Sequence, residues 1–161
     1  MTANQKIVEE LYNAMDLDGE AKPYSRPLYH NKVLRAGCEA KRIDFFDQAM
    51  GQDGVERDIT NMEGSSKLVG TRAFEIETIK LWCTFRPLLD RAFVDLLVGS
   101  YRPIDGSAKE FINGYSLHAN PILLVPEQHF GLILRFRYPI RLNLDVEFGC
   151  VMNGKMYSPT Y

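Results

Sequence analysis

Cysteine is scarce in this chain, and the few cysteines form no motif. Cys38, Cys83 and Cys150 are odd in number, lie far apart and include no Cys-x-x-Cys pair. Zinc sites and disulfide frameworks are built on closely and regularly spaced cysteines. We therefore expect three free and mostly buried thiols in a reducing compartment, and no metal site.

Histidine is equally scarce, and the familiar catalytic motifs are missing. His30, His118 and His129 include no His-x-His pair of the kind that a cupin-type enzyme uses to hold a metal. The sequence also lacks the Gly-x-Ser-x-Gly, Gly-x-Gly-x-x-Gly and phosphate-binding loop motifs. Glu75 and Glu77 are predicted to share a strand face, which we interpret as a solvent or subunit-contact face; paired carboxylates for glycoside hydrolysis are the alternative. We expect no enzyme activity and no cofactor.

Long apolar runs and a strong excess of one charge are absent too. No stretch approaches the roughly 20 apolar residues that span a bilayer. The first ten residues are too polar for a signal peptide, so we expect a protein made and folded in a cytoplasm. The 19 basic and 21 acidic side chains nearly balance, which does not indicate nucleic-acid binding.

What the sequence does contain is alternating hydrophobicity. In two stretches of the last third, apolar side chains occupy every second position, which puts each set on one face of a strand. The two sets are Phe130, Leu132, Leu134 and Phe136, and Leu142, Leu144, Val146, Phe148 and Cys150. Shorter strands are expected over 43–46, 93–98, 101–104 and 122–125. About eight strands in a chain of this length predict an all-β sandwich or jelly roll.

The longest predicted strand covers residues 73–85 and contains an irregularity. Its apolar alternation changes phase between Ile76 and Ile79. A period of two that slips by one residue is typical of a β-bulge, which inserts an extra residue into one strand. We therefore expect a bulge near Glu77 and Thr78.

Local turn chemistry predicts where other strands end. Asn153-Gly154 is a strong two-residue hairpin signal, and Asp105-Gly106 is another. Tyr138-Pro139 is expected to separate the two alternating stretches. Residues 86–91 contain a proline near their start and predict one helical turn.

The first part of the chain, 1–42, is predicted to precede the jelly-roll domain at 43–161. Apolar residues at helical spacing predict a short amphipathic helix over 3–17. Residues 1–20 hold five acids against one lysine, whereas residues 22–42 hold six basic side chains against one acid. We expect an acidic helix and then a basic, proline-containing arm, which either is solvated or docks on a neighbour or an anionic surface.

Basic and aromatic side chains form one further pattern. Arg135, Arg137 and Arg141 flank Tyr138 and predict a patch suited to an acidic neighbour or to phosphate. Ordinary surface arginines laid along apolar surface are the alternative interpretation. Aromatic residues such as Trp82 could form a sugar-binding platform on one face of the sandwich, although most of the aromatic residues are expected in the core.

Three segments of the sequence, taken in order, resemble one family. The first is Phe45-Phe46-Asp47 with Ile59-Thr60-Asn61-Met62, Leu68 and Phe74-x-Ile76-x-x-Ile79; the second is Val94 to Tyr101; the third is Ile122-x-x-Val125-Pro126 with Phe130-x-Leu132-x-Leu134 and Val151-Met152-Asn153-Gly154. Together they resemble the B–C, D–E and G–H–I regions of the jelly-roll capsid proteins of tailless icosahedral viruses, the lineage that includes adenovirus and the phages with an internal membrane. The chain departs from that family at 155–159, where Lys-Met-Tyr-Ser-Pro replaces a strand with Arg-Pro-Val.

The resemblance implies an eight-stranded single jelly roll that works by self-assembly. The expected function is a major capsid subunit of a virion assembled in the host cytoplasm, with copies of itself and a second coat protein as partners. The N-terminal helix and arm would contact neighbouring subunits or an internal lipid membrane. No catalytic, cofactor or metal-binding residue is implied, and no specific nucleic acid. The alternatives are a vertex (penton) protein of the same lineage and a carbohydrate-binding β-sandwich.

Overall fold

The computed structural model of the chain describes residues 2–17, 22–52, 54–55, 57 and 59–159. These residues form one α-helix, two short 3₁₀ helices and nine strands. The helices are α1 (Ala3–Ala14), η1 (Arg86–Arg91) and η2 (Ala108–Phe111). The strands are β1 (Lys22–Leu34), β2 (Glu39–Phe45), β3 (Ala73–Cys83), β4 (Ala92–Val98), β5 (Tyr101–Ser107), β6 (Tyr115–Ser116), β7 (Ile122–Leu124), β8 (Phe130–Arg141) and β9 (Val146–Ser158). The predicted all-β class is confirmed, and no helix in the described ranges is long and apolar enough to cross a membrane.

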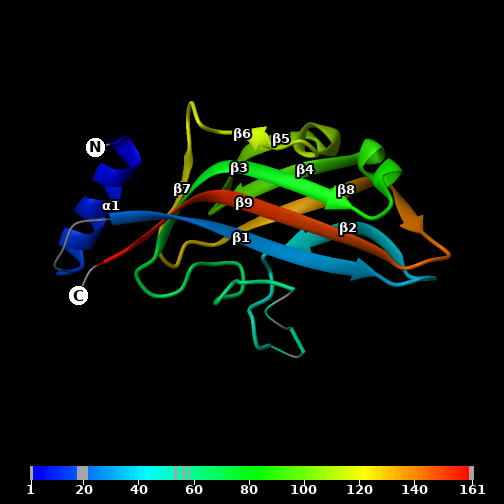
Figure 1. Cartoon of the computed structure of the whole chain (residues 1–161), viewed down its shortest axis with the longest axis horizontal. Helices are drawn as coiled ribbons and strands as arrows, with labels where there is room; N and C mark the ends of the chain where they lie inside the picture. The colour runs from blue at the N-terminus through cyan, green and yellow to red at the C-terminus, as the bar shows by residue number, and fades with distance from the viewer. Residues whose placement is uncertain (1, 18–21, 53, 56, 58, 160–161) are drawn as a thin grey trace.

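The strands form two antiparallel sheets that pack as a sandwich (Figure 1). One sheet has the order β1-β9-β3-β6, with β7 also paired to β3, and the other has the order β2-β8-β4-β5. The pairing is nested, because β1 pairs with β9, β2 with β8, β3 with β7 and β6, and β4 with β5. Nine strands appear instead of eight because two short strands, β6 and β7, share one edge of β3.

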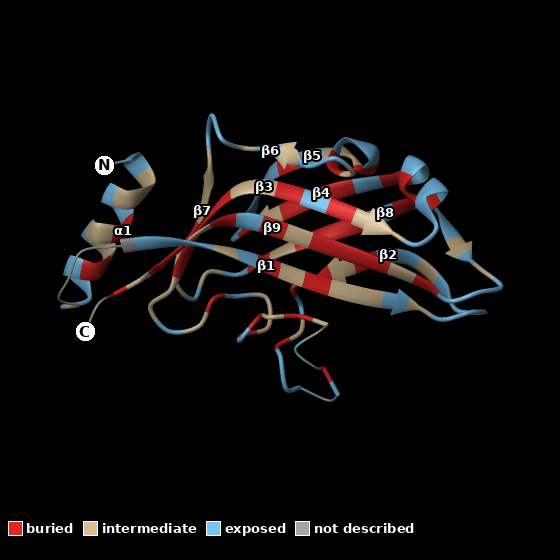
Figure 2. Ribbon diagram, viewed as in Figure 1, coloured by how far each residue is buried: buried red, intermediate tan, exposed pale blue. Residues whose placement is uncertain are grey.

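The core lies between the sheets, where buried positions run along the middle of the strands (Figure 2). Both predicted alternating sets contribute to it: Phe130, Leu132, Leu134 and Phe136 are buried, and so are Val146, Phe148 and Cys150. Each large apolar side chain buried in this way contributes about 1.5–3 kcal/mol. Leu142 is only partly buried and Leu144 is 58% exposed, because both precede the first residue of β9.

The predicted N-terminal helix is confirmed, but it ends at Ala14. Thr2 caps it, since its side-chain oxygen accepts a hydrogen bond of 3.1 Å from the Gln5 backbone N–H. Val8 and Tyr12 are fully buried against Ala73 and Tyr157, so α1 covers one end of the β1-β9-β3 sheet. Two of the five predicted acids, at positions 18 and 20, lie outside the described residues.

Most of the predicted basic arm is strand β1, which pairs with β9 along its whole length. The body of the sandwich therefore begins at Lys22 and not near Ile43. The sequence pattern did not predict this strand, because it contains Pro23 and Pro27, and proline has no backbone N–H to donate to a sheet ladder. Both occupy positions that face the outer edge of β1, so no hydrogen bond to β9 is lost.

A loop at 59–61 covers the outer edge of β1. The backbone N–H of Tyr29 donates to Asn61 Oδ1 at 3.0 Å, and that of Asn31 donates to the Ile59 carbonyl at 2.7 Å. Asn61 Nδ2 in turn donates to the Pro27 carbonyl at 2.7 Å. The middle of this edge is therefore closed to strand addition by another chain.

The predicted bulge in β3 is confirmed, and it explains why the hairpin predicted at Asn153-Gly154 is absent. The register between β3 and β9 shifts between Ile76 and Thr78, which leaves Glu77 as the extra residue. Asn153-Gly154 lies opposite this bulge inside the continuous strand β9, so the predicted hairpin is wrong. Glycine is needed there because a Cβ at Gly154 would lie 1.8 Å from the Glu75 carbonyl oxygen.

Two other turn predictions are wrong for a similar reason. Asp105 and Gly106 pair with β4 inside β5, and the two-residue turn is Gly99-Ser100, where Gly99 has a φ of 59°. Tyr138-Pro139 lies within β8, which continues to Arg141. Sheet pairing thus overrides local turn chemistry at both places. The helical turn predicted over 86–91 is confirmed as η1.

Candidate functional surfaces

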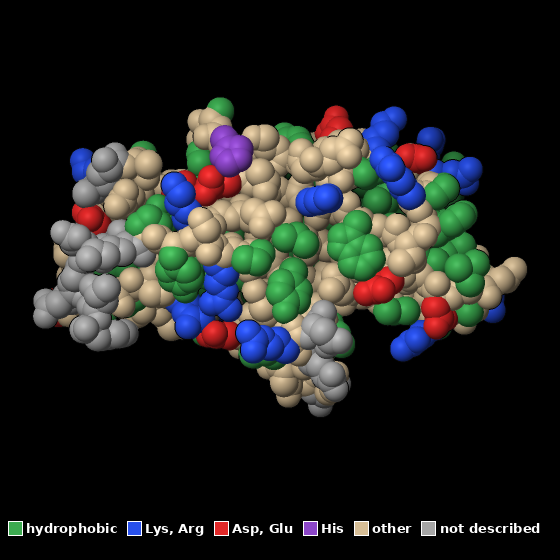
Figure 3. Space-filling model, in the orientation of Figure 1, with side chains coloured by type: hydrophobic (Ala, Val, Ile, Leu, Met, Phe, Trp, Pro, Cys, Tyr) green, Lys and Arg blue, Asp and Glu red, His purple; other side chains and the backbone are tan. Residues whose placement is uncertain are grey.

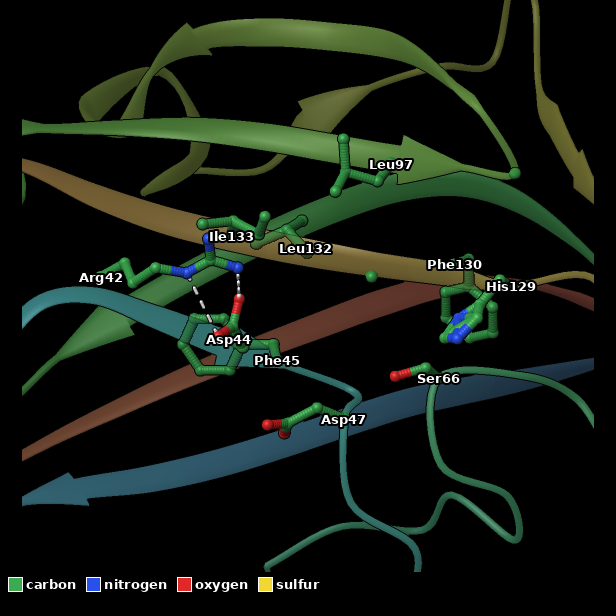
Figure 4. Close-up of a pocket in the computed structure, with 12 residues that line it drawn as sticks. Arg42, Asp44, Phe45, Asp47, Ser66, Leu97, His129, Phe130, Leu132 and Ile133 are labelled. Atoms are coloured by element: carbon green, nitrogen blue, oxygen red, sulfur yellow. Dashed lines mark hydrogen bonds and ion pairs between the residues drawn. The ribbon is translucent and has the colours of Figure 1, made fainter.

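A shallow hollow lies on the outer face of the β2-β8-β4-β5 sheet (Figure 4). Its volume is about 280 Å³, and its floor is low at Gly131, which carries no side chain. The side chains around it are Arg42, Asp44, Phe45, Asp47, Ser66, Leu97, His129, Phe130, Leu132 and Ile133. They come from β2, β4, β8 and the loops that follow β2 and precede β8.

The charges around this hollow are paired. Arg42 Nε lies 3.3 Å from Asp44 Oδ2, and the hydrogen bond to this carboxylate raises the pKa of Arg42. Asp47 accepts from Lys32 Nζ at 2.7 Å. Charge pairs of this kind present both signs to a neighbouring surface and leave no excess charge to attract an ionic ligand.

A second charge cluster on the same sheet is centred on Asp95. This carboxylate is 1% exposed and accepts hydrogen bonds from the Arg135 guanidinium, one of them 3.3 Å long from Nη2. Arg102 Nη1 lies 3.8 Å from the same carboxylate. Arg135, predicted to belong to a free basic patch, is therefore held by a partner on the adjacent strand, and Asp95 is the residue that sequence reasoning missed.

The bulge in β3 builds a polar cavity of about 310 Å³ on the opposite face of the molecule, lined by Ser25, Arg26, Pro27, Glu77, Thr78, His118, Asn153 and Gly154. His118 Nδ1 lies 3.2 Å from Glu77 Oε2. Glu75 makes a separate contact, because it is buried and accepts a hydrogen bond of 3.0 Å from the Tyr157 hydroxyl. Burial and this bond raise the pKa of Tyr157 to about 12. The two glutamates expected on one face thus have different partners.

The three histidines lie in different environments. His30 is fully buried in β1 and accepts a hydrogen bond of 2.7 Å at Nδ1 from the Phe46 backbone N–H. Burial and the neighbouring Lys32 lower its pKa to about 4. His118 is paired with Glu77, and His129 lines the hollow of Figure 4. Within the described ranges, no three His, Cys, Asp or Glu side chains gather closely enough to hold a metal ion.

All three cysteines are free, but only Cys150 is fully buried. Desolvation raises the pKa of the Cys150 thiol strongly. Cys83 is half-buried, and its pKa is also raised by burial. Cys38 is exposed in the connection between β1 and β2, which the sequence pattern did not predict.

The end of the sandwich opposite α1 carries a larger cavity, of about 440 Å³. It lies between η1 and the last part of β8, and Tyr138 at its rim is 70% exposed. The Arg137 guanidinium lies 5.6 Å from the centre of the Tyr138 ring. Figure 3 shows Lys and Arg side chains gathered at this end beside exposed apolar side chains. Of the predicted basic and aromatic patch, Arg137 and Tyr138 therefore lie exposed at this end, whereas Arg135 is paired with Asp95.

Comparison with known proteins finds no matching family model, curated protein or solved structure for this chain.

Proposed function

We propose that this chain is a viral structural protein, a single jelly-roll capsid subunit that acts by self-assembly. The observation that carries the proposal is the nested pairing of the strands. A long antiparallel hairpin rolled over two sheets pairs the first strand with the last, the second with the one before it, and so on inward. Nested pairing of this kind supports a jelly roll, the fold of many viral coat proteins.

The strand orders support the same proposal. In the lettering of the resembling family, β1 to β5 correspond to strands B to F, the β6–β7 segment to G, β8 to H and β9 to I. The two observed orders, β1-β9-β3-β6 and β2-β8-β4-β5, then become B-I-D-G and C-H-E-F. The third resembling segment falls on β7, β8 and β9, as this correspondence requires, whereas the first falls on C and D and the second on E and the start of F, each one strand later than the resemblance implied.

The surface supports an assembly role more than a catalytic one. Two ion pairs, Arg42–Asp44 and Arg135–Asp95, lie on the outer face of β2-β8-β4-β5. A stiff two-layer plate with complementary patches is suited to repeated contacts in closed symmetry. The partners would be copies of this chain and a second coat protein in a virion, either on a face or, as a penton, at a vertex. Contact with an internal membrane belongs to the same proposal.

The experiment is negative-stain electron microscopy of the purified full-length chain at high concentration. The proposal predicts closed particles, rings or capsomer-like oligomers of uniform size. A field of isolated monomers at every concentration and salt condition would count against it. Adding the second coat protein from the native source tests the vertex alternative, which predicts assembly in its presence alone.

A carbohydrate-binding function is the second candidate, and one observation favours it. By the sheet register, Trp82 and Tyr29 both face outward from the β1-β9-β3 sheet, on neighbouring rows. Trp82 packs over Gly149, where a Cβ would lie 2.1 Å from the indole ring. Flat aromatic rings on an open sheet face are suited to stacking on sugars. Binding on a glycan array that Trp82→Ala abolishes would support this candidate, and no binding to any glycan would remove it.

A further inference from the structure

The two ends of the molecule differ in shape and charge. Figure 1 shows α1 at one end of the long axis, and η1 with the last residues of β8 at the other. One end therefore presents a helix, and the opposite end presents the cavity beside Tyr138. Surfaces at opposite ends of one chain can meet only between copies.

The cavity is produced by a large bulge in β8. Ala40 of β2 pairs with Ile140, and Arg42 pairs with Arg135, so residues 136–139 of β8 lie opposite Lys41 alone. Tyr138 lies in this excess stretch of β8 and is 70% exposed. The walls of the cavity are apolar and include Leu88, Phe93, Phe136 and Ile140. Phe93 is 42% exposed, so the cavity offers an apolar surface that this chain itself does not cover.

The rim of the cavity is basic. Arg91 and Arg137 line it together with one acid, Asp90. Within the described part of the chain, neither arginine has a carboxylate within ion-pair distance. This distinguishes them from Arg42 and Arg135, whose charges are neutralised by Asp44 and Asp95. Unpaired arginines around an apolar cavity are typical of a site for an acidic and apolar segment.

Helix α1 has the complementary properties. Residues 2–17 carry three acids, Glu9, Glu10 and Asp16, against one lysine. Ile7 is 47% exposed, and Glu10 follows it on the same helical face at a spacing of three residues. In the described residues, neither Glu9 nor Glu10 has a basic partner within ion-pair distance. The exposed side of the helix thus presents Ile7 together with Glu10 and Lys6, whereas Glu9, two residues from Ile7, lies on another side of the helix.

We propose that α1 of one copy docks in the Tyr138 cavity of the next copy. Ile7 would fill the apolar floor, and Glu10 would pair with Arg91 or Arg137 at the rim. The contact is head-to-tail, so repetition gives a closed ring or an open filament, and the helix-in-groove mode is a common form of recognition. This inference rests on the proposed function, because it names the contact through which the subunits would assemble.

Paired charge reversals in the full-length chain test the contact. One variant carries Glu10→Lys, and the other carries Arg91→Glu and Arg137→Glu. Each variant alone brings like charges together at the contact, so we expect its self-association to weaken roughly 100-fold or more. In a mixture of the two, every helix meets a cavity of opposite charge, and assemblies that contain both variants should return. Sedimentation velocity at low salt measures all three samples, with Lys80→Glu, far from both ends, as the control that assembles like the wild type.

Each outcome decides something definite. If the wild type assembles and the variants assemble equally well, the contact is wrong while the proposed function stands. If the arginine reversals alone disrupt assembly, the cavity takes an acidic segment other than α1, and the inference is overturned. If mixing restores soluble rings or short filaments but no closed particle forms, the contact between α1 and the cavity is supported, and the proposed role in a closed capsid shell is not.

Discussion

The imidazole of His30 joins the two sheets of the sandwich at one corner. His30 lies in β1, and its Nδ1 accepts a hydrogen bond of 2.7 Å from the backbone N–H of Phe46, the residue that follows β2. Phe46 has a φ of 68°, a left-handed conformation that a bulky residue rarely adopts. The imidazole must be neutral to accept this bond, and burial lowers its pKa to about 4.

The stability of the fold should therefore depend on pH. Between the ordinary imidazole pKa of 6.5 and the folded-state value of about 4, the unfolded chain binds more protons at His30 than the folded chain does. The contribution of His30 to the free energy of unfolding is complete above pH 6.5, falls as the pH drops toward 4, and changes no further below that. The loss amounts to something on the order of 3 kcal/mol.

Urea unfolding at several pH values between 4 and 7 measures this loss. His30→Asn should flatten the pH dependence, because the amide oxygen can accept the Phe46 bond without titrating. The exposed His129 provides the control, and His129→Asn should keep the wild-type pH dependence. Identical pH profiles for the wild type and His30→Asn would show that His30 does not carry the effect.

Arg135 and Arg137 should have separable roles. Arg135→Ala removes the main partner of Asp95, a carboxylate only 1% exposed, and should cost on the order of 1–3 kcal/mol of unfolding free energy. Arg137→Ala removes an exposed guanidinium that has no carboxylate partner among the described residues, and should cost less than about 0.5 kcal/mol. Chemical denaturation of both variants checks this, and equal losses would contradict the assignment of Arg135 to the fold and Arg137 to the surface.

Gly154→Ala should strongly destabilise the sandwich. The new Cβ would lie 1.8 Å from the Glu75 carbonyl oxygen, so one of two paired backbones must move. We expect a loss of about 3 kcal/mol or more, seen as a lower thermal midpoint. Gly131→Ala is the matched control, because the nearest atom to its Cβ would be 3.8 Å away. A normal midpoint for Gly154→Ala would mean that the bulge in β3 can relax.

Thiol labelling of the native protein should separate the three cysteines. Cys38 is exposed and should react first with a maleimide, whereas Cys150, buried and with a raised pKa, should react only after unfolding. Mass spectrometry of partly labelled protein identifies the order. Early labelling at Cys150 would contradict its place in the core.

Sequence periodicity predicted the parts of the fold in which side chains alternate between core and solvent. The apolar sets of β8 and β9 and the phase change at Glu77 are visible because each reflects burial. Strand β1 was missed, because its two prolines occupy edge positions that depend on which strand lies beside them. Asn153-Gly154 was misinterpreted since its glycine is required by a carbonyl of another strand.

The candidate surfaces were less predictable than the fold. The arginine pattern around Tyr138 pointed to the correct region, but which arginine is free depends on cross-strand pairing. Arg135 meets Asp95, which is 40 residues away in sequence, whereas Arg137 meets no acid in the described residues. The cavity depends on a bulge that only the β2–β8 register reveals.

The mass of this chain in solution tests the proposed self-assembly. Light scattering of the full-length protein from dilute to concentrated solution, at low and at high salt, gives the weight-average mass. Self-assembly predicts a mass that rises with concentration to a defined oligomer or particle and falls as salt screens the arginine contacts. A mass equal to the 18.4 kDa monomer under every condition would contradict it.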